Sequence, residues 1–318
     1  MKNPFNEGSQ AFMPFYLRIM IGASLWFISY AVISFLGLWI ASSITGTSLA
    51  TFSLGNFENK GPAFAAGLKI IQLFSDLGLF VVPALILPFI IFQHNAVAFM
   101  GMKKRTSFAV FILAICLALG IQPLVTVSAY FNEHLVLPHF LSGMEQQMQA
   151  MEKKNEGLMK SFLQMHGIWD FIINTVIIAI LPAVAEELFF RGFLQKALQI
   201  GLKRSHLAVI ATAFIFSFIH LEFYGFLPRF LLGLLLGYAY LWSGDIKVPI
   251  LIHFTNNFMD LCLSYYSGSV ETGSGVQNSF GIMQILFSIV SLFVLAYLVY
   301  IFKIKLKQQD SMIPYEGN

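Results

Sequence analysis

The sequence predicts an all-α membrane protein that crosses the bilayer about eight times and holds a cluster of polar side chains inside its helical bundle. Of 318 residues, 57% are hydrophobic and only 11% are charged, whereas a soluble domain carries about 25% charged residues. The apolar residues gather in runs of about 20, the length that crosses the hydrocarbon core. The net charge of +3 is too small to indicate a nucleic-acid partner, and the partner that this composition indicates is the lipid bilayer.

Eight apolar runs account for most of the chain. They are residues 15–43, 68–93, 107–130, 168–190, 206–222, 227–243, 248–266 and 280–302. The segment between the third and fourth runs carries charges of both signs, and Gln146 to Leu163 is expected to form a surface helix. This divides the chain into three parts. They are 1–166 with helices 1–3 and an extracytoplasmic segment, a catalytic core at 167–266 with helices 4–7, and 267–318 with the last helix and a basic tail.

Basic residues predict the orientation of the helices. If there are eight spans, most Lys and Arg residues lie on one side of the membrane, and these are Lys2, Arg18, Lys103, Lys104, Arg105, Lys196, Lys203, Arg204, Lys247, Lys303, Lys305 and Lys307. Lys and Arg concentrate in cytoplasmic loops. Both termini are therefore expected in the cytoplasm, with the loop 267–279 outside. The N-terminus lacks the layout of a cleavable signal peptide. This pattern is typical of a multi-pass protein of a bacterial inner (plasma) membrane.

The fourth run ends in Glu186-Glu187-Leu-Phe-Phe-Arg191, and charged groups at membrane depth indicate function. On a helix, Glu187 and Arg191 are four residues apart and can form a charge pair. Glu186 is turned by about 100° from Glu187 and needs another partner. One carboxylate is therefore expected to be structural and the other to be available for chemistry. The alternative is a buried ion-pair cluster that only fixes helix packing.

The fifth and seventh runs supply further polar groups. His220 ends Phe-Ser-Phe-Ile-His, and His253 and Asn257 bound His-Phe-Thr-Asn-Asn, so the latter two share a helix face. If runs four and five form a hairpin that turns near Gly201-Leu202, Glu186 and His220 both lie roughly 24–27 Å from the turn. The two are then at one depth. His253 is harder to place at that depth.

These three motifs resemble the Glu-Glu-x-x-x-Arg, Phe-x-x-x-His and His-x-x-x-Asn signatures of the CAAX-protease and bacteriocin-processing family, also called the Abi family. Its members are intramembrane endopeptidases, and its eukaryotic relatives are the type II CAAX prenyl endopeptidases. The resemblance covers about residues 168–260. It implies that Glu186 is the general base, that His220 helps it to hold the attacking water, and that Glu187 and Arg191 orient the site.

The resemblance also implies that His253 and Asn257 donate hydrogen bonds to the oxyanion of the tetrahedral intermediate. Such donors stabilise a transition state by about 3–4 kcal/mol each. Ser217 lies near these groups but is expected to pack or to hydrogen-bond rather than act as a nucleophile.

Two questions stay open at the level of sequence. Members of this family are often called metalloproteases, and Glu186, His220 and His253 could form a three-ligand zinc site. We nevertheless expect no cofactor, because a carboxylate-activated water explains Arg191 and Asn257 as well. The alternative to an endopeptidase is a non-catalytic multi-span protein, either a small transporter or a scaffold. The resemblance implies a peptide or membrane-protein substrate, and prenylated or bacteriocin-like chains associated with the membrane would fit it. The residues themselves do not identify the substrate.

Overall fold

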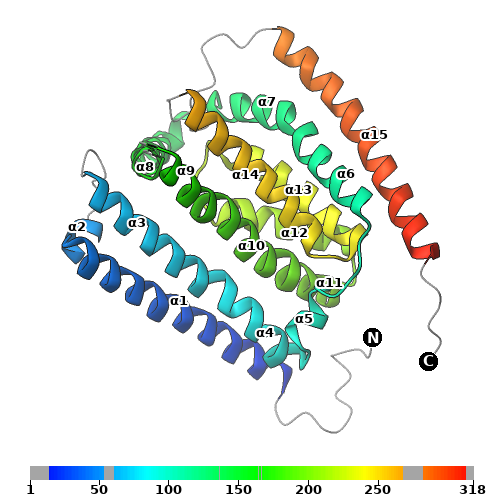
Figure 1. Cartoon of the computed structure of the whole chain (residues 1–318), viewed down its shortest axis with the longest axis horizontal. Helices are drawn as coiled ribbons and strands as arrows, with labels where there is room; N and C mark the ends of the chain where they lie inside the picture. Colours follow the sequence, from blue (N-terminus) through cyan, green and yellow to red (C-terminus); the bar gives the residue numbers. More distant parts are fainter. Residues whose placement is uncertain are drawn as a thin grey trace.

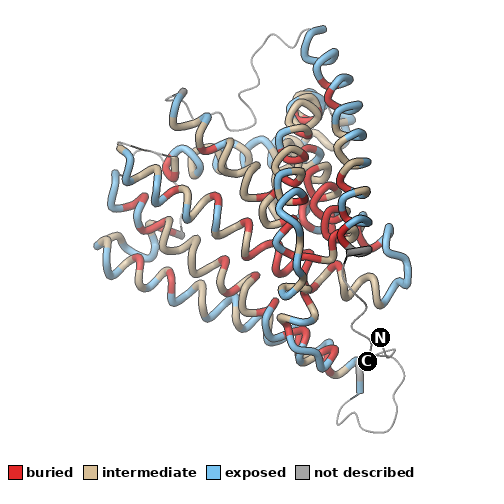
Figure 2. The backbone as a smooth tube through the Cα atoms, turned by 45° about the vertical axis from the view of Figure 1, so that its right-hand side comes forward, coloured by how far each residue is buried: buried red, intermediate tan, exposed pale blue. Residues whose placement is uncertain are grey.

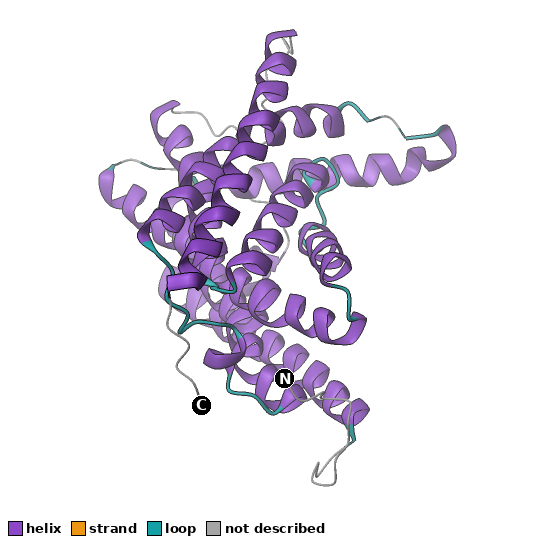
Figure 3. Ribbon diagram, turned by 90° about the vertical axis from the view of Figure 1, so that its right-hand side faces the viewer, coloured by secondary structure: helices purple, strands orange, loops and turns teal. Residues whose placement is uncertain are grey.

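The computed structural model describes residues 14–53, 61–135, 137–163, 165, 167–267 and 282–312, and within these ranges it contains helices and no strands (Figure 3). The long helices lie side by side in successive layers (Figure 1). The order across the molecule begins with α1 (Phe15–Thr45), then α3 (Gly61–Asp76) with α4 (Val82–Phe92), then α10 (Leu181–Glu187) with α11 (Lys196–Leu202).

The remaining layers complete the bundle on the other side of α10. The central helices are α12 (Ser205–Phe218), α13 (Phe226–Ser243) and α14 (Lys247–Ser267), and they are followed by α6 (Phe108–Gly120) with α7 (Gln122–Glu133) and by α15 (Ile282–Met312). Buried residues concentrate in the central helices, whereas α1 and α15 expose much of their apolar surface (Figure 2). This is the distribution expected where lipid, rather than water, covers the outer helices.

The predicted fold class, an all-α polytopic membrane protein, is confirmed. Among the described residues, six helical segments are long and apolar enough to cross a membrane, and they are Tyr16–Thr45, Gly61–Phe92, Phe108–Glu133, Ile168–Leu202, Phe226–Ser243 and Ile282–Gln309. The fifth predicted run forms α12, which has only 14 residues. The seventh forms the full-length helix α14, in which polar side chains interrupt the apolar ones. The count of eight spans therefore stays a prediction.

The segment before the fourth span contains the expected surface helix, α8 (Ser142–Phe162). In Figure 1 it is seen end-on, whereas α3 and α10 lie along the page, so it runs across the end of the bundle. Short elements occupy the remaining connections, and they are α2 (Leu49–Ser53), α5 (Ala96–Phe99), the 3-10 turn η2 (His139–Leu141) and α9 (Ile168–Asn174).

Three π-helical turns interrupt the spans where prolines and functional residues gather. They are η1 (Leu77–Val81), η3 (Thr175–Ile180) and η4 (Leu188–Gln195). The last two flank α10, the short helix that carries both carboxylates. Single π-helical turns inside helices occur frequently at functional sites. Since a π-turn winds more widely than an α-turn, η4 also shortens the stretch between Glu187 and the end of the span.

One end of the bundle gathers the basic residues that the sequence places on one side. Lys247 Nζ donates to the carbonyl of Lys104 at 2.9 Å, and Lys196 donates to the carbonyl of Phe99. Gln309, near the end of α15, donates to the carbonyl of Arg105 at 2.7 Å. We call this the basic end. The chain termini and residues 268–279 of the loop predicted at 267–279 lie outside the described residues, so the predicted orientation stays a prediction.

Candidate active site

The predicted charge pair is present and is completely buried. Arg191 Nη1 lies 2.6 Å from Glu187 Oε1, and neither side chain is exposed to any measurable extent (0%). The same carboxylate oxygen lies 3.0 Å from His253 Nδ1. Because the Glu187 carboxylate can only accept a hydrogen bond, the Nδ1 atom of His253 carries a proton and donates it. The other ring nitrogen, Nε2, is left for a further contact. Glu187 is thus the fixed partner of two cationic or donor groups.

Arg191 is held to the neighbouring helix α13 as well. Its Nη2 donates to the carbonyl of Gly233 at 3.2 Å, and Gln195, one turn later, donates to the carbonyl of Gly237 at 3.0 Å. A Cβ added at Gly237 would lie 2.9 Å from Val209 and 3.0 Å from the Gln195 amide oxygen. Small residues at this spacing allow helices in membranes to approach closely. Glycine here makes room for both α12 and the Gln195 side chain.

Glu186 differs from its neighbour in its position. It is 8% exposed, and its Oε2, like Oε2 of Glu187, is buried with no hydrogen-bond partner. It lines a cavity of about 540 Å³ together with His220, His253 and Asn257. Glu187 and Arg191 lie behind this cavity rather than on its wall. A buried carboxylate oxygen without a partner is costly and needs an explanation, and a reacting water or substrate group in the cavity would supply one.

His220 does not lie on the helix, contrary to the assumption behind the depth estimate. The fifth predicted run extends to 222, but α12 ends at Phe218, because the chain turns there. His220 Nδ1 instead lies 2.8 Å from the carbonyl of Phe216, one of the last carbonyls of α12, which has no partner within the helix. This contact leaves Nε2 of His220 free on the cavity wall.

Phe216 connects the groups of the site, a role that the sequence did not reveal. Its ring lies under the guanidinium of Arg191, with the carbon Cζ 4.5 Å from the ring centroid. It also packs edge-on against His253, at 5.8 Å, and against His220, at 5.4 Å. Ser217 donates to the carbonyl of Phe226 at 2.6 Å and is buried, in agreement with its expected role in hydrogen bonding.

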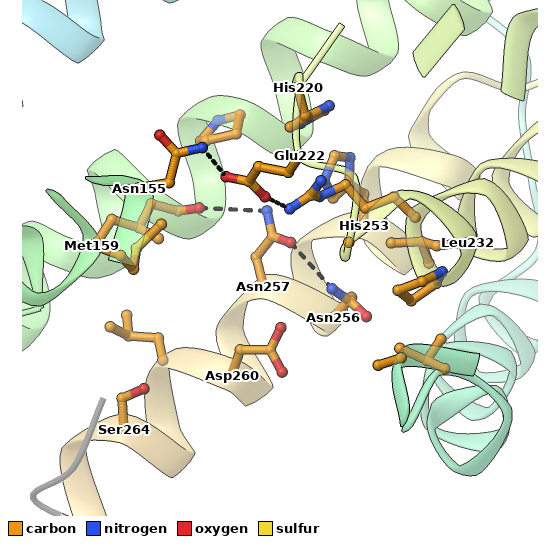
Figure 4. Close-up of a pocket in the computed structure, with 18 of the residues that line it drawn as sticks. Asn155, Met159, His220, Glu222, Leu232, His253, Asn256, Asn257, Asp260 and Ser264 are labelled. Carbon is orange, nitrogen blue, oxygen red and sulfur yellow. Dashed lines mark hydrogen bonds and ion pairs between the residues drawn. The ribbon is translucent and has the colours of Figure 1, made fainter. Parts of the chain in front are cut away.

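Asn257 hydrogen-bonds to a backbone carbonyl that a proline leaves without its α-helical partner. Pro182 has no N–H, so it cannot make the α-helical bond to the carbonyl of Ile178. That carbonyl accepts from Asn257 Nδ2 at 3.4 Å (Figure 4). The Nδ2 group has a second hydrogen, and Asn257 lines the cavity. Asn257 therefore keeps one donor for a bound group.

The sequence analysis did not assign several other polar residues to the site, although they line the cavity. Gln122, a polar residue within the third apolar run, donates to Asn256 Oδ1 at 2.9 Å and lines the cavity. Helix α8 contributes Glu152, Asn155 and Glu156. The amphipathic pattern of 146–163 predicted a surface helix, but it did not indicate which element the polar face would contact.

The three residues considered as zinc ligands line the same cavity, and each histidine has its Nε2 available. In zinc sites the other ring nitrogen commonly donates to a carboxylate or a carbonyl, as both Nδ1 atoms do here. Within the described ranges, however, no group of three or more His, Cys, Asp or Glu side chains is arranged to hold a metal ion. The donor types thus fit zinc, whereas their spacing in this structure does not.

A family model matches the part of the chain that forms this site. Residues 168–259 match the model described as type II CAAX prenyl endopeptidase Rce1-like. Comparison with curated proteins and with solved structures gives no match. The matched segment runs from α9 to α14 and contains both carboxylates, Arg191, both cavity histidines and Asn257. The resemblance drawn from the three motifs is confirmed over residues 168–259, which match the model of a CAAX-protease family.

Proposed function

We propose that this protein is an intramembrane endopeptidase in which Glu186 activates a water molecule for attack on a peptide bond. The observation that carries the proposal is the division of labour between adjacent carboxylates. Oε1 of Glu187 accepts from Arg191 and His253 behind the cavity, whereas Glu186 lies on the cavity wall with its unpartnered Oε2. The match to a protease family supports a peptidase in general. The carboxylate and its neighbours support this particular mechanism.

The first step requires a base beside the water. Glu186 takes a proton from the water while the water oxygen forms a bond to the carbonyl carbon of the substrate. His220, whose Nδ1 is committed to the carbonyl of Phe216, accepts a hydrogen bond from the same water through Nε2. Two acceptors fix the water and direct its lone pair toward the carbonyl carbon. The carbonyl π electrons move to oxygen, giving a tetrahedral intermediate.

The negative charge on that oxygen needs donors. His253 carries Glu187 behind it as a counter-ion at 3.0 Å, so its protonated form can donate from Nε2. The second hydrogen on Asn257 Nδ2 is the other donor. The intermediate then collapses, the C–N bond breaks, and protonated Glu186 gives its proton to the leaving amine. The products are a carboxylic acid and an amine, with Glu186 regenerated as carboxylate.

The substrate class that we propose is a peptide or protein segment associated with the membrane. The cavity lies among membrane-crossing helices, and its walls are both apolar and polar. A prenylated or bacteriocin-like chain would fit this description. The matched family description concerns prenyl endopeptidases, and it comes to this chain only as part of the proposal.

The test is Glu186→Gln, which keeps the shape of the side chain but removes its ability to accept a proton. Loss of an acid–base group typically lowers turnover by 10²–10⁴-fold. The measurement is cleavage of membrane-fraction peptides by purified protein, with detergent melting as a check on folding. Turnover above about a tenth of wild type in a normally folded variant would refute the assignment of the base.

A further inference from the structure

The cavity that contains Glu186 lies toward the end of the bundle opposite the basic end. α12 begins beside the basic residues Lys203 and Arg204 and runs away from them to the loop 219–225, which lines the cavity. α14 begins at Lys247 of the basic end, and its far half supplies Asn257, Asp260 and Ser264 to the cavity wall. The cavity therefore reaches the end of the bundle that α8 crosses.

At this far end, hydrogen bonds join α7 and α8 to the loop that follows α12. Asn132, at the end of α7, donates to the carbonyl of Phe223 at 2.6 Å. Asn155 of α8 donates to Glu222 Oε1 at 3.1 Å, and Glu222 forms an ion pair with Arg229 (Figure 4). The polar face of α8 is thus joined to the loop after α12, directly over the cavity.

The charges on the cavity wall are unbalanced. Six acidic residues line it, and they are Glu133, Glu152, Glu156, Glu186, Glu222 and Asp260. Arg229 is the one lysine or arginine among the described lining residues. On α8 the charges are sorted by face, since Glu152 and Glu156 line the cavity while Lys153 and Lys154 are exposed and do not. Carboxyl groups therefore outnumber basic groups on the cavity wall, and α8 turns its acidic residues, not its lysines, toward the cavity.

A second observation points to a ligand in the cavity. Glu186 is more than nine-tenths buried, and its Oε2 has no hydrogen-bond partner although it lies on the cavity wall. A positively charged or hydrogen-bonding group entering from the far end would meet acidic side chains along its path to this oxygen.

Resting on the proposed peptidase function, we infer that the site receives a basic peptide segment from the extracytoplasmic face of the membrane. Lys and Arg concentrate on the cytoplasmic side, so the basic end faces the cytoplasm and the cavity opens on the other side. An acidic passage attracts lysine and arginine side chains and repels acidic ones. The substrate class is a cationic segment of an exported or membrane-anchored chain. A neutral or acidic segment is disfavoured.

The face is tested by labelling, without any activity. In a protein whose cysteines are replaced (Cys116→Ala with Cys262→Ala), single cysteines are introduced as Lys153→Cys, Ser264→Cys and Lys307→Cys. We expect a membrane-impermeant maleimide to label the first two in intact spheroplasts and Lys307→Cys only after lysis. If Ser264→Cys disturbs folding, Tyr266→Cys, at an 84% exposed position near the same helix end, replaces it. The reverse labelling pattern would overturn the inference.

The charge preference is tested by binding to Glu186→Gln protein in a neutral detergent, so that cleavage plays no part. The probes are a short fluorescein-labelled Leu/Ala peptide with interspersed lysines and the same peptide with glutamines in their place. We expect tighter binding of the lysine peptide and a loss of roughly two- to fivefold on adding Glu152→Gln or Glu156→Gln. Glu145→Gln, the same change on the same helix but off the cavity wall, should have no effect.

The outcomes separate the two proposals. Equal binding of both peptides, or an equal loss with Glu145→Gln, would overturn the inference. Selective binding of the lysine peptide to a protein that cleaves nothing in its wild-type form would refute the peptidase and leave the inference standing.

Discussion

His253 donates from Nδ1 to Oε1 of Glu187, at 3.0 Å, and not to the adjacent Glu186. The same oxygen accepts from Arg191 at 2.6 Å. The two neighbouring carboxylates on one helix therefore differ in their surroundings. Oε1 of Glu187 accepts from two side chains and Glu187 lies off the cavity wall, whereas Glu186 lies on that wall. Each of the two also keeps a buried Oε2 without a hydrogen-bond partner. Because a base must be free to take a proton, this relationship supports Glu186 rather than Glu187 as the proposed base.

Arg191→Ala should destabilise the protein as well as inactivate it. The substitution leaves Glu187 as a buried charge facing only His253 and removes the bond to the carbonyl of Gly233. Breaking a buried pair costs about 3–5 kcal/mol. Melting in detergent is the measurement, and Arg204→Ala, at an exposed position in the loop after α11, is the control. An inactive variant with the melting temperature of the wild type would show that Arg191 contributes to the reaction and not to stability.

Asn257→Ala should lower turnover by on the order of 10²–10³-fold, because one oxyanion donor is lost. Substrate binding should change much less, since the donor acts on charge that forms only in the transition state. Single-turnover kinetics measure both quantities. Thr255→Ala, two residues away, removes a hydroxyl that bonds only to the helix backbone and is the matched control. A loss confined to KM would contradict the role of Asn257 as an oxyanion donor.

Purified, active protein should contain well under one metal ion per chain. The proposed water activation uses side chains alone, and Asn257 and His253 have defined tasks in it. Elemental mass spectrometry on protein of known specific activity checks this, with a strong chelator added in parallel. Stoichiometric zinc, together with activity lost to the chelator and restored by the metal, would make Glu186, His220 and His253 ligands instead.

Glu152→Gln should stabilise the protein at alkaline pH and leave its stability at acidic pH nearly unchanged. Burial, reinforced by Glu156, raises the pKa of the Glu152 carboxyl, although Arg229 opposes the shift. A raised folded-state pKa means that the folded protein binds this proton more tightly than the unfolded chain does. Stability therefore falls as pH rises from the unfolded pKa through the folded one. Melting curves across pH for both proteins test this, and parallel curves would contradict it.

The sequence predicted local relationships well and distant ones incompletely. The Glu187–Arg191 pair follows from a four-residue spacing, which survives even though η4 is π-helical. The depth estimate for His220 assumed unbroken α-helices, and no periodicity in an apolar run signals a π-turn or the helix end at Phe218. The contact between His253 and Glu187 joins residues 66 positions apart. Their meeting depends on how α10 and α14 pack, which local spacing does not determine.

The residues that line the cavity also depend on contacts between distant parts of the chain, which local spacing does not determine. Gln122 was visible as a polar residue in an apolar run, but its partner Asn256 lies on a helix more than a hundred residues later. The charges of α8 indicated a surface helix, whereas the contact of its acidic face with the cavity depends on Asn155 reaching Glu222. Polar residues within spans identify where a site is. Only the packing shows which of them face it.

The bonds from Arg191 and Gln195 to the carbonyls of Gly233 and Gly237 join two helices at two successive turns. Sliding one helix along the other by one turn, about 5.4 Å, would leave one of these side chains without its carbonyl. The height of Glu186 along the membrane normal is therefore set by contacts that Glu186 does not make. In the proposed mechanism a peptide bond is cut where it meets this carboxylate. The register of α13 against the helix that carries Glu186 would then determine how far from the membrane surface a chain is cleaved.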